Sequence, residues 1–180
     1  MENSLEKLIL QCKKRERVAQ KQIYDTFGAV LFSICLRYAS SYEDAQDNFQ
    51  EGFVIIFNKI DQFEFQGSFE GWMKRIMVNL SLEKYRKKTI LTNNDIENQY
   101  DIAEEESEYF DQDFEYEKLI QLIQTLPNQY RQVFNLYAIE NYSHQEIAEL
   151  LQISVGTSKS NLSRARAILK QKLTSQLNPK

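Results

Sequence analysis

The chain has 180 residues, enough for one domain or two small ones. Its 11 Phe and 10 Tyr, with only two Pro and five Gly, favour a helical protein with an aromatic core. The net charge of −4 disfavours nucleic acid as a partner on overall attraction alone. The sequence has no apolar run long enough for a signal peptide or a membrane span, which needs about 18 residues. We therefore expect a soluble, cytoplasmic protein.

The charge is distributed unevenly along the chain. Residues 89–117 contain 11 Asp or Glu and no Lys or Arg. The rest of the chain has 22 basic against 15 acidic residues, a net charge of +7. Two basic clusters are the group Lys74, Arg75, Lys84, Arg86, Lys87 and Lys88, and the six basic residues between Lys159 and Lys180. Such local clusters matter more for phosphate binding than the total charge does.

Apolar residues at helical spacing predict four helices in the first half. Their expected spans are about Leu5–Cys12, Val18–Tyr38, Ser41 or Tyr42 to Lys59, and Phe69–Arg86. The apolar stripe of the second helix comprises Ile23, Tyr24, Phe27, Val30, Leu31, Ile34, Cys35 and Tyr38. The third helix is expected to bury Ala45, Phe49, Phe53, Ile56, Phe57 and Ile60. Residues 61–68, DQFEFQGS, form a polar and aromatic loop between the third and fourth helices.

The acidic segment 89–113 has little periodicity, so we expect a linker that is flexible at least in part, although its aromatic residues could dock locally. Two further helices are expected at about Tyr116–Thr125 and Asn128–Ile139, with Leu126-Pro127 ending the first. The predicted fold is all-α, with two small helical domains joined by an acidic linker.

A helix-turn-helix pattern covers residues 142–173. Ser143 and Glu146 have the spacing of a capping box, and Ser154 is placed to cap a second helix after a short turn. The expected apolar face of that helix is Val155, Ser158, Leu162, Ala165, Leu169 and Leu173. The opposite face carries Thr157, Ser160, Arg164 and Gln171, with Lys159, Asn161 and Ser163 on the flanks. Such side chains suit base edges and phosphates in a major groove. The alternative is a solvated amphipathic helix in a bundle.

Two clusters in the first half each have two interpretations. The group Glu43, Asp44, Asp47, Gln50 and Glu51 suits the dipole at a helix start, or forms a docking face for a basic protein. Phe63, Phe65, Phe69 and Trp72 are interleaved with Lys74, Arg75, Asn79, Lys84, Tyr85, Arg86 and Lys87. Aromatic and basic residues in this arrangement suit single-stranded nucleic acid. The alternative is that Phe69, Trp72, Ile76 and Leu80 are only the core stripe of a helix.

The sequence contains no catalytic constellation. The single histidine, His144, stands at a helix start, where an exposed or capping role is commoner than metal ligation. There is no Cys and His metal set, phosphate-binding glycine loop, or paired nucleophile and base. We therefore expect neither enzymatic activity nor a cofactor. Cys12 and Cys35 are expected to be reduced thiols, with a structural disulfide as the alternative.

Two segments resemble bacterial RNA polymerase sigma factors. DNFQEGF (47–53) with IDQFEFQGSFEGWMKRIMVNLSLEKYRKK (60–88) resembles region 2, and LPNQYRQVFNLYAIENYSHQEIAELLQISVGTSKSNLSRARAILKQKL (126–173) resembles region 4. The layout without a region 3 is similar to the extracytoplasmic-function (ECF) subfamily of the sigma-70 family. The resemblance implies region 2 at 1–88, a linker at 89–113 and region 4 at 114–177. It also implies a factor that binds core RNA polymerase and directs it to promoters. The alternative is a stand-alone helix-turn-helix transcriptional regulator, which has no use for the DNFQEG segment.

The resemblance assigns residues to partners. Positions that dock on the largest polymerase subunit in the family match Asp47, Gln50 and Glu51. Positions that capture a flipped base of the −10 element, or contact the melted strand and upstream duplex, match Phe63, Phe65, Gly67, Ser68, Lys74, Arg75, Asn79, Lys84 and Arg86. Positions that face the −35 major groove match Ser154, Gly156, Thr157, Lys159, Ser160, Ser163 and Arg164.

Two residues depart from the family pattern. Asn48 stands where an aliphatic residue is common, which leaves the local docking geometry open. Asn161 stands where many relatives carry arginine, which leaves the −35 sequence preference open. The acidic linker is hypothesised to mimic nucleic acid in the polymerase or to suppress DNA binding by the free factor. Relatives are commonly held by a membrane-bound anti-sigma protein, and we expect an anti-sigma partner.

Overall fold

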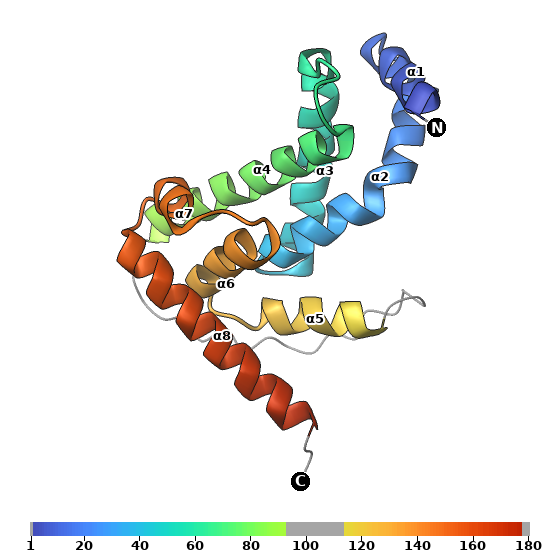
Figure 1. Ribbon diagram of the computed structural model, residues 1–180. Helices are drawn as coiled ribbons and strands as arrows, with labels where there is room; N and C mark the ends of the chain where they lie inside the picture. Colours follow the sequence, from blue (N-terminus) through green and yellow to red (C-terminus); the bar gives the residue numbers. More distant parts are fainter. Residues whose placement is uncertain (1, 93–113, 178–180) are drawn as a thin grey trace. The chain divides into compact units, whose positions relative to one another are not determined.

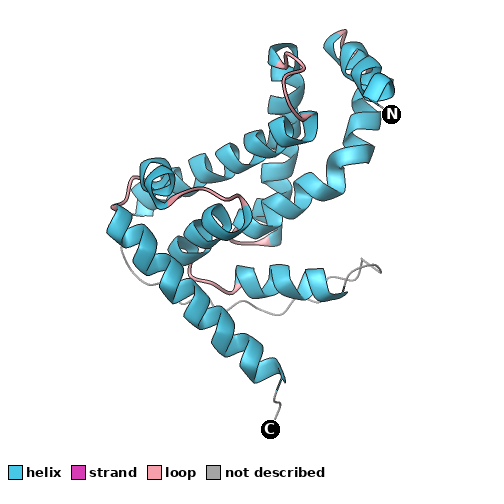
Figure 2. Ribbon diagram, in the orientation of Figure 1, coloured by secondary structure: helices cyan, strands magenta, loops and turns pink. Residues whose placement is uncertain are grey.

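The computed structural model describes residues 2–92 and 114–177. Within these ranges the chain forms helices and loops without any strand, which confirms the predicted all-α class (Figure 2). No helix in the described ranges is long and apolar enough to cross a membrane. From residue 93 onward, the predicted acidic linker lies outside the described residues. Two compact units, Met1–Lys84 and Tyr85–Lys180, are described separately below.

The first unit contains the N-terminal helices. They are α1 (Glu2–Lys13), α2 (Arg17–Tyr38), α3 (Tyr42–Lys59), the short 3-10 turn η1 (Ile60–Gln62) and α4 (Phe69–Thr92), whose last residues, from Tyr85 onward, belong to the second unit (Figure 1). α2 packs along α3, while α1 contacts both α2 and η1. The predicted spans agree with these bounds except that α4 continues past Arg86 to Thr92. No Gly or Pro interrupts the sequence there, so nothing local ends the helix.

Side chains from all four helices fill the core of the first unit. Those that are fully buried are Ile9, Ile23, Leu31, Ile34, Ile56, Ile60, Met73, Met77 and Leu82. Two members of the predicted α2 stripe, Tyr24 and Val30, are instead 44% and 40% exposed. Tyr24 and Val30 lie at the edge of the apolar stripe of α2, and the helices that pack against α2 do not cover the full width of that stripe. Tyr24 still contacts α3, because its ring centroid lies 4.7 Å from that of Phe53.

Both cysteines are buried in the first unit and carry free thiols. Burial raises the pKa of the Cys12 thiol to about 11 and that of the Cys35 thiol to about 12. These thiols therefore stay protonated and unreactive near neutral pH. The reduced state is confirmed, and the disulfide alternative is wrong.

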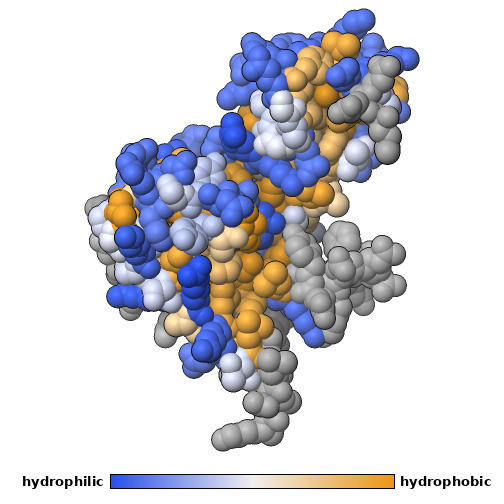
Figure 3. Space-filling view, in the orientation of Figure 1, coloured by the Kyte–Doolittle hydropathy of each residue, from blue (hydrophilic) through white to orange (hydrophobic). Residues whose placement is uncertain are grey.

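The second unit contains the remaining helices. They are α5 (Phe114–Gln124), α6 (Asn128–Phe134), the π-helical turn η2 (Asn135–Ile139), α7 (His144–Leu151) and α8 (Val155–Leu177). α8 packs against α5, α6 and α7 around a core of Leu122, Leu126, Ala165 and Leu169. Figure 3 shows mostly hydrophilic residues over α7 and the outer side of α8, with hydrophobic residues along the side of α8 toward α5 and α6. The helix-turn-helix thus rests on one continuous apolar face.

The structure corrects the predicted faces of α8 at three positions. Val155 and Leu173 were expected in the core but are 40% and 46% exposed. The buried positions Ser158, Leu162, Ala165 and Leu169 occupy the middle of the helix, so the packing partners do not cover its two ends. Asn161, expected on a flank, is only 5% exposed because it lies beside this buried stripe.

Candidate nucleic-acid interface

The loop between η1 and α4 rests on a buried aromatic base. Phe63 is 4% exposed, and its ring centroid lies 5.0 Å from that of Phe69 and 5.6 Å from that of Trp72. Phe69 and Trp72 are stacked on each other with centroids 5.6 Å apart. Phe69 therefore belongs to the core, as the core-stripe alternative predicts, and the same rings lie beneath the loop. Binding of single-stranded nucleic acid by this cluster stays a prediction.

Phe65 differs from the other loop aromatics in conformation and exposure. Its φ of 59° places it in the left-handed region, which costs a non-glycine residue free energy unless its surroundings hold it there. The ring is 39% exposed and lies 5.4 Å from the ring of Phe63. Gly67 follows with a φ of 81°, and no atom lies within 4 Å of the place its side chain would take. The loop therefore presents one partly exposed aromatic ring, and its backbone at Gly67 takes a conformation that favours glycine.

The cations of α4 are partly engaged within the protein. Ser68 caps the helix, since its Oγ accepts a hydrogen bond from the Gly71 backbone nitrogen at 3.2 Å. Lys74 Nζ lies 2.6 Å from Glu70 Oε1, and Lys84 Nζ lies 2.7 Å from Glu51 Oε2. Arg75 and Asn79 are exposed on the same helix, and Arg86 lies further along it. The sequence assigned Lys84 and Glu51 to different partners, but the structure pairs them with each other.

The acidic cluster of α3 divides into two parts. Glu43 and Asp44 occupy the first turn, and the Asp44 backbone nitrogen donates to the Ser41 cap at 3.1 Å. They fit the helix-dipole interpretation. The exposed residues Asp47, Gln50 and Glu51 lie beyond this turn. Asn48 is 5% exposed, so this departure from the family pattern faces the interior.

The helix-turn-helix begins with the predicted capping box. The Ser143 backbone nitrogen donates to Glu146 Oε2 at 2.8 Å, and the Glu146 nitrogen donates back to Ser143 Oγ at 3.3 Å. Hydrogen bonds to the Glu146 carboxylate from the Ser143 backbone, and then from its side chain, hold the pKa of Glu146 below its usual value. Gln152 ends α7 in the left-handed conformation, and Ser154 Oγ accepts from the Thr157 nitrogen at 2.9 Å to start α8. Local sequence therefore determines the angle at which α8 leaves the turn.

The residues predicted to contact the −35 element are all exposed at the start of α8. They are Ser154, Gly156, Thr157, Lys159, Ser160, Ser163 and Arg164. Lys159, which the helical wheel placed on a flank, is thus accessible. Arg164 Nη1 donates to the Tyr130 hydroxyl at 3.1 Å, so α6 orients this guanidinium. The structure brings these seven residues together at the N-cap and in the first half of α8.

Several supporting residues were not found from the sequence. His144 Nδ1 lies 2.9 Å from the buried Ser158 Oγ, and its ring stacks on Tyr137 with centroids 4.5 Å apart. Burial, followed by the charges of Lys159 and Arg166, lowers the pKa of His144. Tyr130 and Tyr137 have no local signal, because their partners lie in a different helix. Lys13, which also was not singled out, lies against the loop of the first unit.

Comparisons with known proteins agree with this geometry. The family models "Sigma-70 region 2" and "Sigma-70, region 4" match residues 23–90 and 116–169. The "ECF RNA polymerase sigma factor SigW" of Bacillus subtilis is 29% identical over 184 residues, covering 96% of this chain and 98% of that protein. The chain is an ECF sigma factor of the sigma-70 family. As such it directs RNA polymerase to promoters, and it is not an enzyme.

Two further relatives of this sigma factor cover most of its length. The "ECF RNA polymerase sigma-E factor" of Haemophilus influenzae is 24% identical, covering 92% of this chain and 93% of that protein. A solved sigma factor, RpoE from Bartonella quintana in complex with the anti-sigma factor NepR, has a TM-score of 0.54 at 22% identity. It covers 86% of this chain and shares its fold. The alternative of a stand-alone regulator is set aside, because the chain contains region 2 as well as region 4.

Proposed function

We propose that the two units of this sigma factor contact promoter DNA in two different states. The first unit holds an unpaired base of the −10 element, and the second unit holds the −35 element as duplex. The position of Phe65 is the observation that carries this proposal, because its ring is 39% exposed, packs against the buried ring of Phe63 and is held in a left-handed backbone conformation. A base that leaves the duplex loses stacking worth a few kcal/mol, and an aromatic ring replaces that stacking.

The −10 residues divide by role in this proposal. Phe65 stacks on the base. Phe63 is only 4% exposed, so its ring packs beneath the Phe65 ring and does not itself contact the base. Gly67 and Ser68 shape the wall of the loop. The polar residues Lys74, Arg75, Asn79, Lys84 and Arg86 follow the phosphates of the melted strand and the upstream duplex.

The −35 residues use the ordinary geometry of a recognition helix. Ser154, Gly156 and Thr157 lie at the N-terminus of α8, where backbone amides and short side chains suit a phosphate. Lys159, Ser160, Ser163 and Arg164 extend along the exposed face toward base edges. Tyr130 holds Arg164 by its hydroxyl and so orients the longest of these side chains before DNA arrives.

We further propose that Asp47, Gln50 and Glu51 form the surface that docks on the largest polymerase subunit. They are exposed on one helix, beyond the acids that cap it. Glu51 is paired with Lys84, so docking through Glu51 would release Lys84 for DNA. This exchange would couple polymerase binding to the −10 contacts at little cost, because exposed ion pairs are worth only about 0–1 kcal/mol.

We propose the following organisation for the whole chain. We place region 2 at 1–88, the acidic linker at 89–113 and region 4 at 114–177. The linker is proposed to mimic nucleic acid in the polymerase or to suppress DNA binding by the free factor. Neutralising the 11 acids of residues 89–117 should then raise the DNA affinity of the free protein.

Because the polymerase and the promoters lie in the cytoplasm, we propose that this sigma factor acts there. We also propose an anti-sigma partner that covers the docking and DNA-facing surfaces.

Site-specific photo-crosslinking tests the two-state proposal. A benzophenone amino acid replaces Phe65 in one variant and Ser163 in another, and each variant is assembled with core polymerase on a promoter identified by run-off transcription. We expect position 65 to crosslink the nontemplate strand of the −10 element only after melting, and position 163 to crosslink the −35 duplex before and after melting. Crosslinks from position 65 to closed duplex, or from both positions to the same element, would contradict the proposal.

A further inference from the structure

The C-terminal end of α1 reaches the segment that leads into the loop of the first unit. Arg15 follows α1 with a φ of 63°, and two backbone hydrogen bonds close the helix end, from the Arg15 nitrogen to Cys12 O at 2.9 Å and from the Glu16 nitrogen to Gln11 O at 3.2 Å. Glycine is usual at such a position, because the left-handed conformation costs other residues roughly 1–2 kcal/mol. The presence of arginine therefore points to a use for its side chain.

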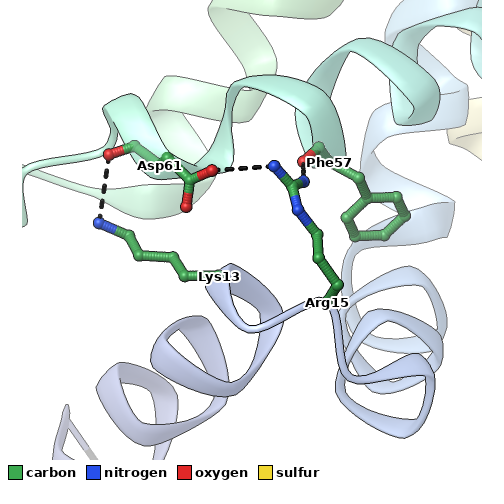
Figure 4. A network of polar contacts seen from close by, with 4 residues as sticks. All are labelled: Lys13, Arg15, Phe57 and Asp61. Carbon is green, nitrogen blue, oxygen red and sulfur yellow. Dashed lines mark hydrogen bonds and ion pairs between the residues drawn. The ribbon is translucent and has the colours of Figure 1, made fainter.

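Arg15 uses that side chain to hold η1 and the end of α3. Its guanidinium donates to the Phe57 carbonyl oxygen and forms an ion pair with Asp61 Oδ2 at 2.8 Å (Figure 4). Phe57 lies in the last turn of α3 and Asp61 lies in η1, so both precede residues 63–68. An ion pair at half-exposed side chains adds little stability by itself. Its effect is to fix where the chain enters the loop.

Lys13 contacts the loop itself. Its Nζ donates to the Phe63 carbonyl oxygen at 2.6 Å. It also lies 3.5 Å from the Asp61 carbonyl oxygen (Figure 4). The same ammonium lies 5.0 Å from the centroid of the Phe65 ring, within the range of a cation–π attraction. One charged group therefore holds both the backbone that precedes Phe65 and its ring.

We propose that Lys13 and Arg15, which we name the α1 clasp, are positioning residues for the capture of an unpaired base by Phe65. This inference rests on the function proposed above for the loop. Without support, the left-handed backbone of Phe65 is disfavoured, so only a fraction of loops would present the ring correctly. Apparent affinity falls in proportion to that fraction. The clasp raises the fraction and leaves part of the ring exposed for the base.

The clasp lies outside the part of the chain that the region 2 family model matches, which begins at residue 23. The α1 clasp therefore adds α1 to the elements that we propose bind the −10 element. General attraction of DNA by a basic segment is the competing explanation, and Lys14 separates the two. Lys14 is an exposed cation next to Lys13 in the same turn, so replacing it removes an equal charge from nearly the same place.

Binding of single-stranded DNA by the assembled holoenzyme tests this inference. The probe is the nontemplate −10 strand of a promoter identified by run-off transcription, carrying 2-aminopurine at the captured base. We expect Lys13→Met to weaken binding about fivefold and Arg15→Gly about two- to threefold, with Lys13→Arg restoring it to within about twofold. Lys14→Met should cost less than about twofold, and that loss should vanish near 0.3 M salt, whereas the loss with Lys13→Met should persist. Core polymerase affinity should stay unchanged, and no variant should lower the thermal midpoint of the free protein, although Arg15→Gly should raise it because glycine accepts the left-handed conformation.

Two other results would overturn the inference. If Lys13→Met and Lys14→Met weaken the probe equally and lose their effect together in salt, Lys13 acts as an ordinary cation. If Lys13→Met and Arg15→Gly bind like the wild type, the clasp does not position the loop. Failure of the wild-type holoenzyme to bind the probe, despite specific run-off transcription, would instead refute the function proposed for Phe65.

Discussion

The loop of the first unit and the recognition helix of the second differ in how their shape is maintained. Phe65 stands in a left-handed conformation, and the groups that hold it come from α1 and from the aromatic base under the loop. The exposed face of α8 needs no such help, because Ser154 caps a regular helix that rests on α5, α6 and α7. A regular helix can read the ordered base edges in the major groove of a duplex. An unpaired base instead has to be held by an aromatic ring in a defined position. The difference predicts which changes damage each contact.

Truncating Phe65 should have the largest effect. Loss of base stacking is worth about 1–3 kcal/mol, so Phe65→Ala should reduce open promoter about 5- to 150-fold. Permanganate reactivity of melted thymines measures that fraction. Phe65→Trp keeps an aromatic face and should retain most melting. Normal melting by Phe65→Ala would show that the loop does not hold the base.

Adding side-chain atoms at the contact between α3 and α4 should have the next largest effect. A Cβ atom on Gly52 would collide with Met77 Sδ, so Gly52→Val should destabilise this unit by about 1–3 kcal/mol. The matched change Gly71→Ala meets Ser68 Cβ only at 3.6 Å and should be neutral or stabilising by up to about 1 kcal/mol. Urea unfolding monitored by Trp72 fluorescence measures both. If the Gly52→Val and Gly71→Ala variants had equal urea midpoints, α3 and α4 would not pack closely at Gly52.

Truncating Arg164 should have a smaller and more selective effect. Arg164→Ala should weaken use of particular −35 sequences by about 1–2 kcal/mol, while core polymerase binding stays intact. Arg166→Ala removes the same charge from the same helix and provides the control. Competition between promoters that differ only in the −35 element measures the effect. Equal losses on every −35 sequence, or equal losses from both variants, would reduce Arg164 to a phosphate contact.

Protonation of His144 should have the smallest effect. Its pKa in the folded protein is lowered, so the unfolded chain binds the proton more readily. The second unit should therefore be fully stable above the ordinary histidine pKa of about 6.5 and lose some stability as the pH falls below it. Glu146, whose pKa is also lowered, acts at a lower pH, because its stabilisation is lost only below the ordinary carboxyl range. Thermal unfolding of the wild type and of His144→Gln between about pH 5 and 8 measures this. An identical pH dependence in both would exclude His144 as the cause.

The sequence predicted those parts of the fold that depend on residues a few positions apart in the chain. The capping box of Ser143 and Glu146 spans three positions, so spacing alone identified it. The contact from Lys13 to Phe63 spans 50 positions and has no local signature. Asn161 was placed on a flank of α8 by its helical position, but the neighbouring helices cover that flank and bury it. The π-helical turn at Asn135–Ile139, which brings Tyr137 against His144, also had no local signal.

The most direct test of the two-state account compares Phe65→Ala and Arg164→Ala holoenzymes on two probes. One probe is the single-stranded −10 nontemplate strand, and the other is a −35 duplex that lacks the −10 element. The account predicts a crossed result, in which Phe65→Ala loses only the single strand and Arg164→Ala loses only the duplex. If both variants weaken both probes to the same extent, the two units do not divide promoter recognition between single-stranded and duplex DNA.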